Sequence, residues 1–115
     1  TGVQTCALPI SKSVLTAWDK TLETRVFSHL SVFLSDDFQF ENTTGDIGDL
    51  AGTESWCVAG ELRISNFKTI RENDSYIVAT HDVVQDGKPH SNVMVYAEQT
   101  NGKFTYWKIQ RAFDV

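Results

Sequence analysis

The 115 residues carry a net charge of −5, with 41% hydrophobic and 22% charged residues. This composition is that of an ordinary globular domain and excludes a disordered chain, which would be poorer in apolar residues. An acidic chain without a basic cluster is repelled by a phosphate backbone, so we expect no binding of nucleic acid. No apolar run approaches the roughly 20 residues that span a bilayer, so we expect no membrane insertion.

The first ten residues, TGVQTCALPI, show no periodicity or capping signal that links them to the helix predicted after them. A secretory signal needs a basic start and a longer apolar core, and this stretch has neither. It resembles, residue for residue, the translation of a common short-read sequencing adapter. We therefore expect residues 1–10 to be a non-native leader and residues 11–115 to form a single domain. Without Cys6, Cys57 stands alone, which predicts no disulfide, no zinc site and a reduced, cytoplasmic setting.

Three helices and a strand are expected in the first half of the chain. Residues 13–25 place Val14, Leu15, Trp18 and Leu22 at helical spacing, which predicts an amphipathic helix. A short second helix is predicted over residues 28–35, with Ser28 as its N-cap. Residues 36–42 alternate apolar and polar side chains and predict a strand. A third helix is predicted around residues 53–58.

From residue 61 onward the pattern is that of strands. Four stretches predict them, over residues 61–71, 75–84, 91–99 and 104–113. Asp86-Gly87 and Asn101-Gly102 separate two pairs of these stretches, and both dipeptides favour tight hairpins because they tolerate a positive φ. The sequence therefore predicts an α+β fold in which the N-terminal helices pack on a curved antiparallel sheet and enclose a cone-shaped cavity.

The order of these parts resembles the nuclear transport factor 2-like superfamily. The features that carry the resemblance are Trp18 on the first helix, a short second helix, Asp36-Asp37-Phe38, a strand ending in Glu41-Asn42 before a glycine turn, and the final NGKFTYWKIQRAF. This group includes ketosteroid isomerase, SnoaL-like polyketide cyclases and scytalone dehydratase. The resemblance implies an α+β cone and a homodimer, but a fold by itself does not fix the chemistry.

The resemblance also indicates what the chain lacks. The tyrosine that donates to the dienolate oxygen of ketosteroid isomerase falls at Trp18, the general-base aspartate at Asn42, and the second acidic donor near Met94. An amide is no proton acceptor near neutral pH, and a thioether is no acidic donor. The isomerase reaction of that family is therefore not expected here.

A pocket follows from strand alternation if Met94 faces inward. The candidate ligand-binding residues are then Trp18, Met94, Tyr96, Trp107 and Arg111, with His81 and Asn42 as catalytic candidates. His81 is favoured as acid or base because its ordinary pKa lies near physiological pH. The alternatives are a core role for His81 and a base at Glu41 or the Asp36-Asp37 pair. Two roles are open for Arg111, a clamp on a substrate carboxylate and an ion pair with Glu41 or Glu98.

Two classes of function remain open from the sequence. The first is a SnoaL-like domain whose apolar pocket binds or transforms a small hydrophobic carbonyl compound, without metal or cofactor. The second is a non-catalytic module that binds a ligand or dimerises. We also expect a homodimer through the outer face of the sheet, to which Phe104, Tyr106 and Gln110 point if Trp107 points inward.

Overall fold

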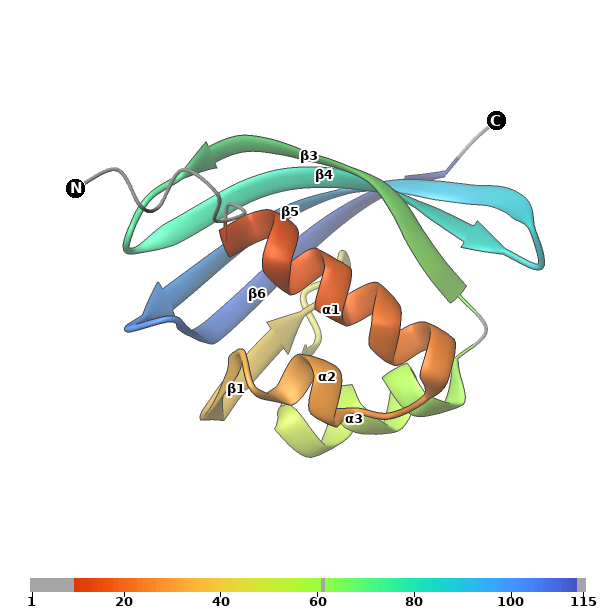
Figure 1. The fold of residues 1–115 in the computed structure, drawn as a ribbon. Coiled ribbons are helices and arrows are strands. Elements are labelled where there is room, and N and C mark those ends of the chain that lie inside the picture. The colour runs from red at the N-terminus through yellow and green to blue at the C-terminus, as the bar shows by residue number, and fades with distance from the viewer. Residues whose placement is uncertain (1–9, 61, 114–115) are drawn as a thin grey trace.

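The computed structural model describes residues 10–60 and 62–113. Its elements, in chain order, are α1 (Ile10–Thr24), α2 (Ser28–Ser31), β1 (Leu34–Glu41), β2 (Ile47–Gly48), α3 (Leu50–Ala59), β3 (Leu62–Glu72), β4 (Tyr76–Gln85), β5 (Lys88–Thr100) and β6 (Lys103–Phe113). The three helices lie in the first half of the described chain, with β1 and β2 between α2 and α3, and the four long strands β3 to β6 follow (Figure 1). The predicted α+β fold is confirmed.

The six strands form one sheet in the order β2-β1-β6-β5-β4-β3. Strands β3 to β6 make the predicted antiparallel meander, whereas β1 pairs with β6 in parallel, so the sheet is mixed. Both predicted hairpins have a positive φ at each turn residue: 53° and 76° at Asp86-Gly87, and 53° and 82° at Asn101-Gly102. These are the signs of a tight turn whose twist matches that of the strands.

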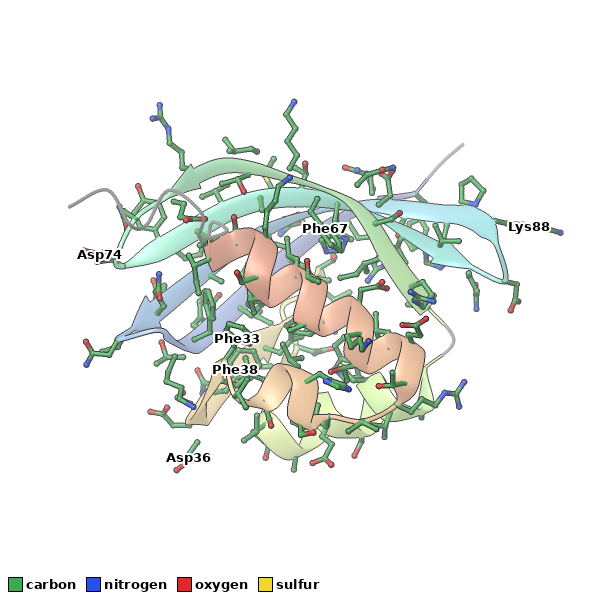
Figure 2. The ribbon with its side chains drawn as sticks, viewed as in Figure 1. Phe33, Asp36, Phe38, Phe67, Asp74 and Lys88 are labelled. Carbon is green, nitrogen blue, oxygen red and sulfur yellow. The ribbon has the colours of Figure 1, made fainter. Side chains whose placement is uncertain are left out.

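Helix α1 lies across the concave face of the curved sheet and packs on β3 and β4 (Figure 1). Its apolar stripe is the predicted one and is buried, with Val14, Leu15, Trp18 and Leu22 all in the core. Figure 2 shows Phe67 between the sheet and α1, and Phe38 near the junction of α2 and β1. Because α1 covers the concave side, the core lies between this helix and the sheet.

A residue of β3 caps the N-terminus of α1. Both carboxylate oxygens of Glu72, at the end of β3, accept backbone N–H bonds of 3.0 Å from Ile10 and Ser11. A carboxylate at a helix N-terminus accepts hydrogen bonds from N–H groups that have no partner within the helix. Its negative charge also interacts favourably with the positive end of the helix dipole. Ile10 packs against the core, so the helix begins one residue before the predicted domain boundary. The other residues of the expected leader, 1–9, lie outside the described part of the chain.

The second helix is shorter than predicted. It is a single turn, and the predicted helical extent to residue 35 is wrong because Leu34 already pairs with Phe104 in β6. Phe104 also donates its N–H to the carbonyl of Phe33 at 2.7 Å, so strand pairing ends the helix. Ser28 is the first helical residue rather than the N-cap, and Phe27 before it makes no side-chain cap bond.

Two predicted strand faces are inverted in the structure. Met94 and Tyr96 were expected to face the cavity but are 48% and 37% exposed on the outer face. The pairing of His81 with Val93 puts Val93, and with it Val95, on the inner face. Phe104 was expected to point outward but is fully buried, because the pairing of β5 with β6 shifts between Glu98 and Gln99. Such an irregularity places one extra residue in a strand and exchanges the faces beyond it.

Candidate functional site

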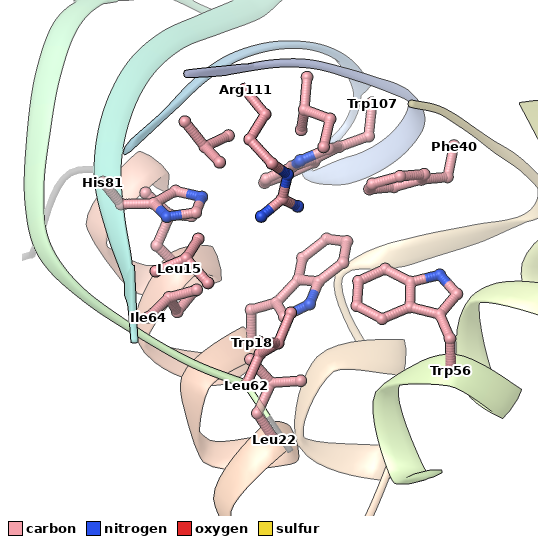
Figure 3. Close-up of a pocket in the computed structure, with 13 residues that line it drawn as sticks. Leu15, Trp18, Leu22, Phe40, Trp56, Leu62, Ile64, His81, Trp107 and Arg111 are labelled. Carbon is pink, nitrogen blue, oxygen red and sulfur yellow. The ribbon is translucent and has the colours of Figure 1, made fainter. Parts of the chain in front are cut away.

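An inner cavity of roughly 40 Å³ lies between α1, α3 and the sheet. Its lining residues are Leu15, Trp18, Leu22, Phe40, Trp56, Leu62, Ile64, His81, Val83, Val93, Trp107, Ile109 and Arg111. The structure thus brings together four of the residues that the sequence singled out, namely Trp18, His81, Trp107 and Arg111. Figure 3 shows their side chains directed toward a common space.

A wider vestibule of about 480 Å³ adjoins this cavity. It is lined by Phe40, Asn42, Thr43, Thr44, Trp56, Leu62, Ile109, Arg111 and Phe113, five of which also line the inner cavity. Small-molecule sites commonly have volumes of about 300–1,000 Å³. The vestibule alone falls within this range, and the inner cavity is its narrow end.

Aromatic rings form much of the wall. Trp18 lies at the centre, with ring centroids 4.8 Å from Trp107, 5.9 Å from Trp56 and 6.0 Å from Phe40. Phe40 and Trp56 are 5.4 Å apart and meet edge to face. The sequence analysis missed these last two. The apolar alternation of residues 38–40 is a signal that could have placed Phe40 inward.

His81 is 7% exposed and lines the inner cavity. Its Nδ1 lies 3.2 Å from the carbonyl oxygen of Asp82. A carbonyl only accepts, so this contact requires the proton on Nδ1 and leaves Nε2 as the free acceptor. Burial lowers the pKa of His81 from its ordinary 6.5, and the nearby Arg111 charge acts in the same direction. His81 is therefore neutral at physiological pH and has the form that a general base requires.

Arg111 is held at two points. Its backbone N–H donates to Thr43 Oγ1 at 3.1 Å, and its Nη1 donates to Ser91 Oγ at 2.8 Å. Burial lowers the pKa of the guanidinium below its ordinary value. In Figure 3 the guanidinium points into the space between His81 and Trp18.

Glu41 and Glu98, the two carboxylates that the sequence suggested as ion-pair partners of Arg111, bind other residues. Glu41 accepts bonds of 2.8 Å from Lys108 and 2.7 Å from Tyr106, and Glu98 accepts one of 2.6 Å from Tyr96. The lysine and tyrosine bonds lower the pKa of Glu41. Glu41 lines neither space, so its alternative role as a catalytic base has no support from this geometry.

Asn42 is placed in the vestibule and does not line the inner cavity with His81. Its Oδ1 accepts three bonds, from the N–H of Thr44 at 3.0 Å, the hydroxyl of Thr44 at 2.7 Å and the N–H of Asp46 at 3.1 Å. This pattern fixes the turn after β1. The amide group thus shapes the rim of the site, and Met94 and Tyr96, on the outer face, take no part in it.

Other reactive groups lie apart from this chemistry. Burial raises the pKa of Cys57 to about 12, so its thiol stays protonated. Across residues 10–60 and 62–113 no group of three or more His, Cys, Asp or Glu side chains is placed to hold a metal ion. Within the same ranges no helix is long and apolar enough to cross a membrane.

No sequence-family profile matches the chain, and no curated protein matches it in sequence. Solved structures do match. An NTF2-like protein of unknown function from Cytophaga hutchinsonii is 14% identical with a TM-score of 0.71, over 95% of this chain and 94% of that one. A proposed ketosteroid isomerase from Kribbella flavida is 11% identical with a TM-score of 0.74, over 92% and 80%. AclR, a proposed hydroxylase from Streptomyces galilaeus, is 13% identical with a TM-score of 0.68, over 90% and 73%. The resemblance seen in the sequence is thereby confirmed at the level of architecture: the chain has the nuclear transport factor 2-like fold.

Proposed function

We propose that the chain binds and transforms a small, flat, hydrophobic carbonyl compound in the inner cavity and vestibule. The observation that carries this proposal is the convergence of four aromatic rings on two polar groups, His81 and Arg111. Apolar walls with a few polar groups are typical of small-molecule sites. Two of the similar structures are described as a proposed isomerase and a proposed hydroxylase, so this fold accommodates such sites elsewhere.

His81 is the acid–base group of this proposal. Its free Nε2 acts as the proton acceptor, because Nδ1 is committed to the Asp82 carbonyl. Ketosteroid isomerase chemistry stays disfavoured: Asn42 offers no carboxylate, and the inward neighbours of Met94 are Val93 and Val95, which offer no acidic donor. The reaction class that fits is proton abstraction beside a carbonyl with imidazole as base.

Binding of acetophenone, a flat apolar ketone, tests the first part of this proposal. All three tryptophans of the chain line the cavity, so saturable quenching of intrinsic fluorescence reports occupancy. We expect calorimetry to give one site per chain and the fluorescence titration to give the same affinity. Val32→Ala, which shortens an exposed side chain outside the site, is the control and should bind equally. Native mass spectrometry of freshly purified protein would identify a co-purified ligand. Absence of both heat and saturable quenching would contradict the proposal.

A second proposal concerns assembly, since the outer face of the sheet carries exposed apolar groups. Tyr96 lies between Tyr76 and Tyr106, with ring centroids 6.0 and 6.4 Å away, and Met94 beside it is 48% exposed. An exposed sheet face is normally polar, and an apolar patch marks a covered surface. We propose that a second copy of the chain covers this outer face, which also accommodates the alternative function as a dimerisation module.

Met94→Glu should therefore break the dimer. A charge placed in a desolvated interface lowers affinity strongly, and we expect the dissociation constant measured by sedimentation equilibrium to rise more than about 10-fold. Val32→Glu puts the same charge at a position that is 60% exposed outside the outer face and should leave association unchanged. A wild-type chain that sediments as a monomer at micromolar concentration would remove the proposal.

A further inference from the structure

We propose that the ligand of this site is an aromatic carboxylate, anchored through its carboxylate by Arg111. The inference rests on the proposed function and adds a carboxylate to its carbonyl compound: the ligand is a flat aromatic ketone that also carries a carboxylate. Arg111 binds the carboxylate, and His81 takes the proton from the carbon beside the ketone. The inference follows from the charge, the geometry and the dimensions of the site.

Among the described residues, no carboxylate balances the positive charge of the site. Among the described residues that line the inner cavity and the vestibule, Arg111 is the one with a formal charge at neutral pH, since burial keeps His81 neutral. No carboxylate of residues 10–60 or 62–113 lies within 4.0 Å of its guanidinium, whereas Arg63 and Lys108 have such partners. A charge drawn out of water is costly unless an opposite charge meets it. A bound anion supplies that charge.

The N–H groups of the Arg111 guanidinium that have no partner among the described residues can bind a carboxylate. Nη1 donates to Ser91 Oγ at 2.8 Å, and the remaining N–H groups donate to no described residue. The backbone bond to Thr43 fixes the start of the side chain, so the guanidinium is positioned before a ligand arrives. Arginine presents a planar fork that fits two carboxylate oxygens. A phosphate would call for further donors, and the lining residues contain no second cation.

The dimensions and walls of the site select the rest of the ligand. The inner cavity of roughly 40 Å³ is too small for a ring, whereas the vestibule of about 480 Å³ holds one. Phe40 and Trp56 line both spaces and present aromatic surfaces beside the guanidinium. Aromatic walls favour a flat apolar ring. The ring therefore lies in the vestibule, with its carboxylate directed inward to Arg111.

Benzoate, benzamide and acetophenone form a matched set of probes, because they share a ring and differ in charge. We expect calorimetry on the full chain to show benzoate binding about 10- to 100-fold more tightly than benzamide, the range of a charge-assisted bond. Arg111→Gln should remove that difference, and Arg111→Lys should keep part of it. Arg71→Gln removes the same charge from an exposed position on β3 outside the site and should bind as the wild type does.

The outcomes separate this inference from the proposed function. Benzamide or acetophenone binding as tightly as benzoate would overturn the carboxylate assignment and leave the apolar site in place. Equal benzoate affinity in Arg111→Gln and wild type would overturn the anchor. Failure of all three probes to bind would overturn the proposed function and this inference together. The comparison of benzoate with benzamide uses the wild-type chain, so it does not depend on the folding of any variant.

Discussion

Trp107→Ala should cost about 3–5 kcal/mol of the free energy of unfolding, the range observed for deleting a buried tryptophan. Trp107 is 2% exposed, lies against Trp18 and packs on Phe104 with ring centroids 5.4 Å apart. It also sits where β6 joins both β1 and β5, paired with Phe40 and Ala97. Removing the indole opens a void at that junction, and total stabilities are only about 5–15 kcal/mol. Urea denaturation followed by circular dichroism measures the loss.

Trp56→Ala is the matched control for this experiment. The same indole is removed from the same cavity wall, but Trp56 is 39% exposed and sits on α3, so we expect a loss below about 2 kcal/mol. Its effect on ligand affinity should be the larger one, because Trp56 lines both the inner cavity and the vestibule. Equal losses of stability in the two variants would show that burial does not distinguish them, and the assignment of Trp107 to the core would fail.

The fold could be predicted because its signals are local. Two of these signals are the apolar stripe of α1 at helical spacing and the turn dipeptides Asp86-Gly87 and Asn101-Gly102. Each acts over a few residues, and no tertiary contact overrides it. The parallel pairing of β1 with β6 could not be foreseen in this way. It joins Phe40 to Trp107, 67 residues apart in sequence, and no local pattern encodes such a contact.

The site was predicted in part, and the misses have a common cause. His81 was placed correctly because β4 alternates without interruption around it. Trp107 was placed correctly because the irregularity of β6 lies before Tyr106 and the alternation is regular from there to Ile109. Met94 and Tyr96 were misplaced because the register of β5 was taken from a family position rather than from its own alternation of Val93, Val95 and Ala97. A shift of one residue inverts a whole strand face.

Sequence reasoning left two roles open for Arg111, a clamp on a ligand carboxylate and an ion pair with Glu41 or Glu98, and could not choose between them. The sequence offered Glu41 and Glu98 as its partners, and only the geometry assigns these to Lys108 and Tyr96. An unbalanced charge is a property of the folded site, since it depends on which side chains the fold brings within reach of one another.

His81→Gln should lower general-base catalysis by about 10²–10⁴-fold, the usual contribution of a positioned acid–base group. The reaction to follow is exchange of the methyl protons of acetophenone for deuterium in D₂O, measured by NMR. The Nε2 of His81 takes a proton from the carbon beside the carbonyl, and the resulting enolate takes a deuteron back. Glutamine has a similar length but no basic nitrogen, so it removes the proton acceptor while retaining a polar side chain.

The pH dependence of this exchange has a defined direction. The active form is neutral imidazole, and burial lowers the pKa of His81 below 6.5, so the rate should persist to lower pH than free imidazole permits.

The free energy of unfolding depends on the same titration of His81. Below pH 6.5 the unfolded chain takes up a proton at His81 more readily than the folded chain does, so the free energy of unfolding falls as the pH falls. Asp19 and Glu72, whose pKa values are also lowered, lose their contributions only below about 3.8 and 4.5.

The exchange rate and the pH dependence of stability together test the catalytic role of His81 separately from its contribution to the core. His81→Gln should slow the exchange by the same factor of about 10²–10⁴ and remove the part of the loss of stability below pH 6.5 that His81 causes, whereas the same change at His29, which does not line the site, should leave the exchange intact. If wild type and His81→Gln exchange acetophenone protons at the same rate while both bind it, the base assignment is wrong. The pocket then belongs to a non-catalytic binding module, in which a buried neutral imidazole serves to shape an aromatic wall.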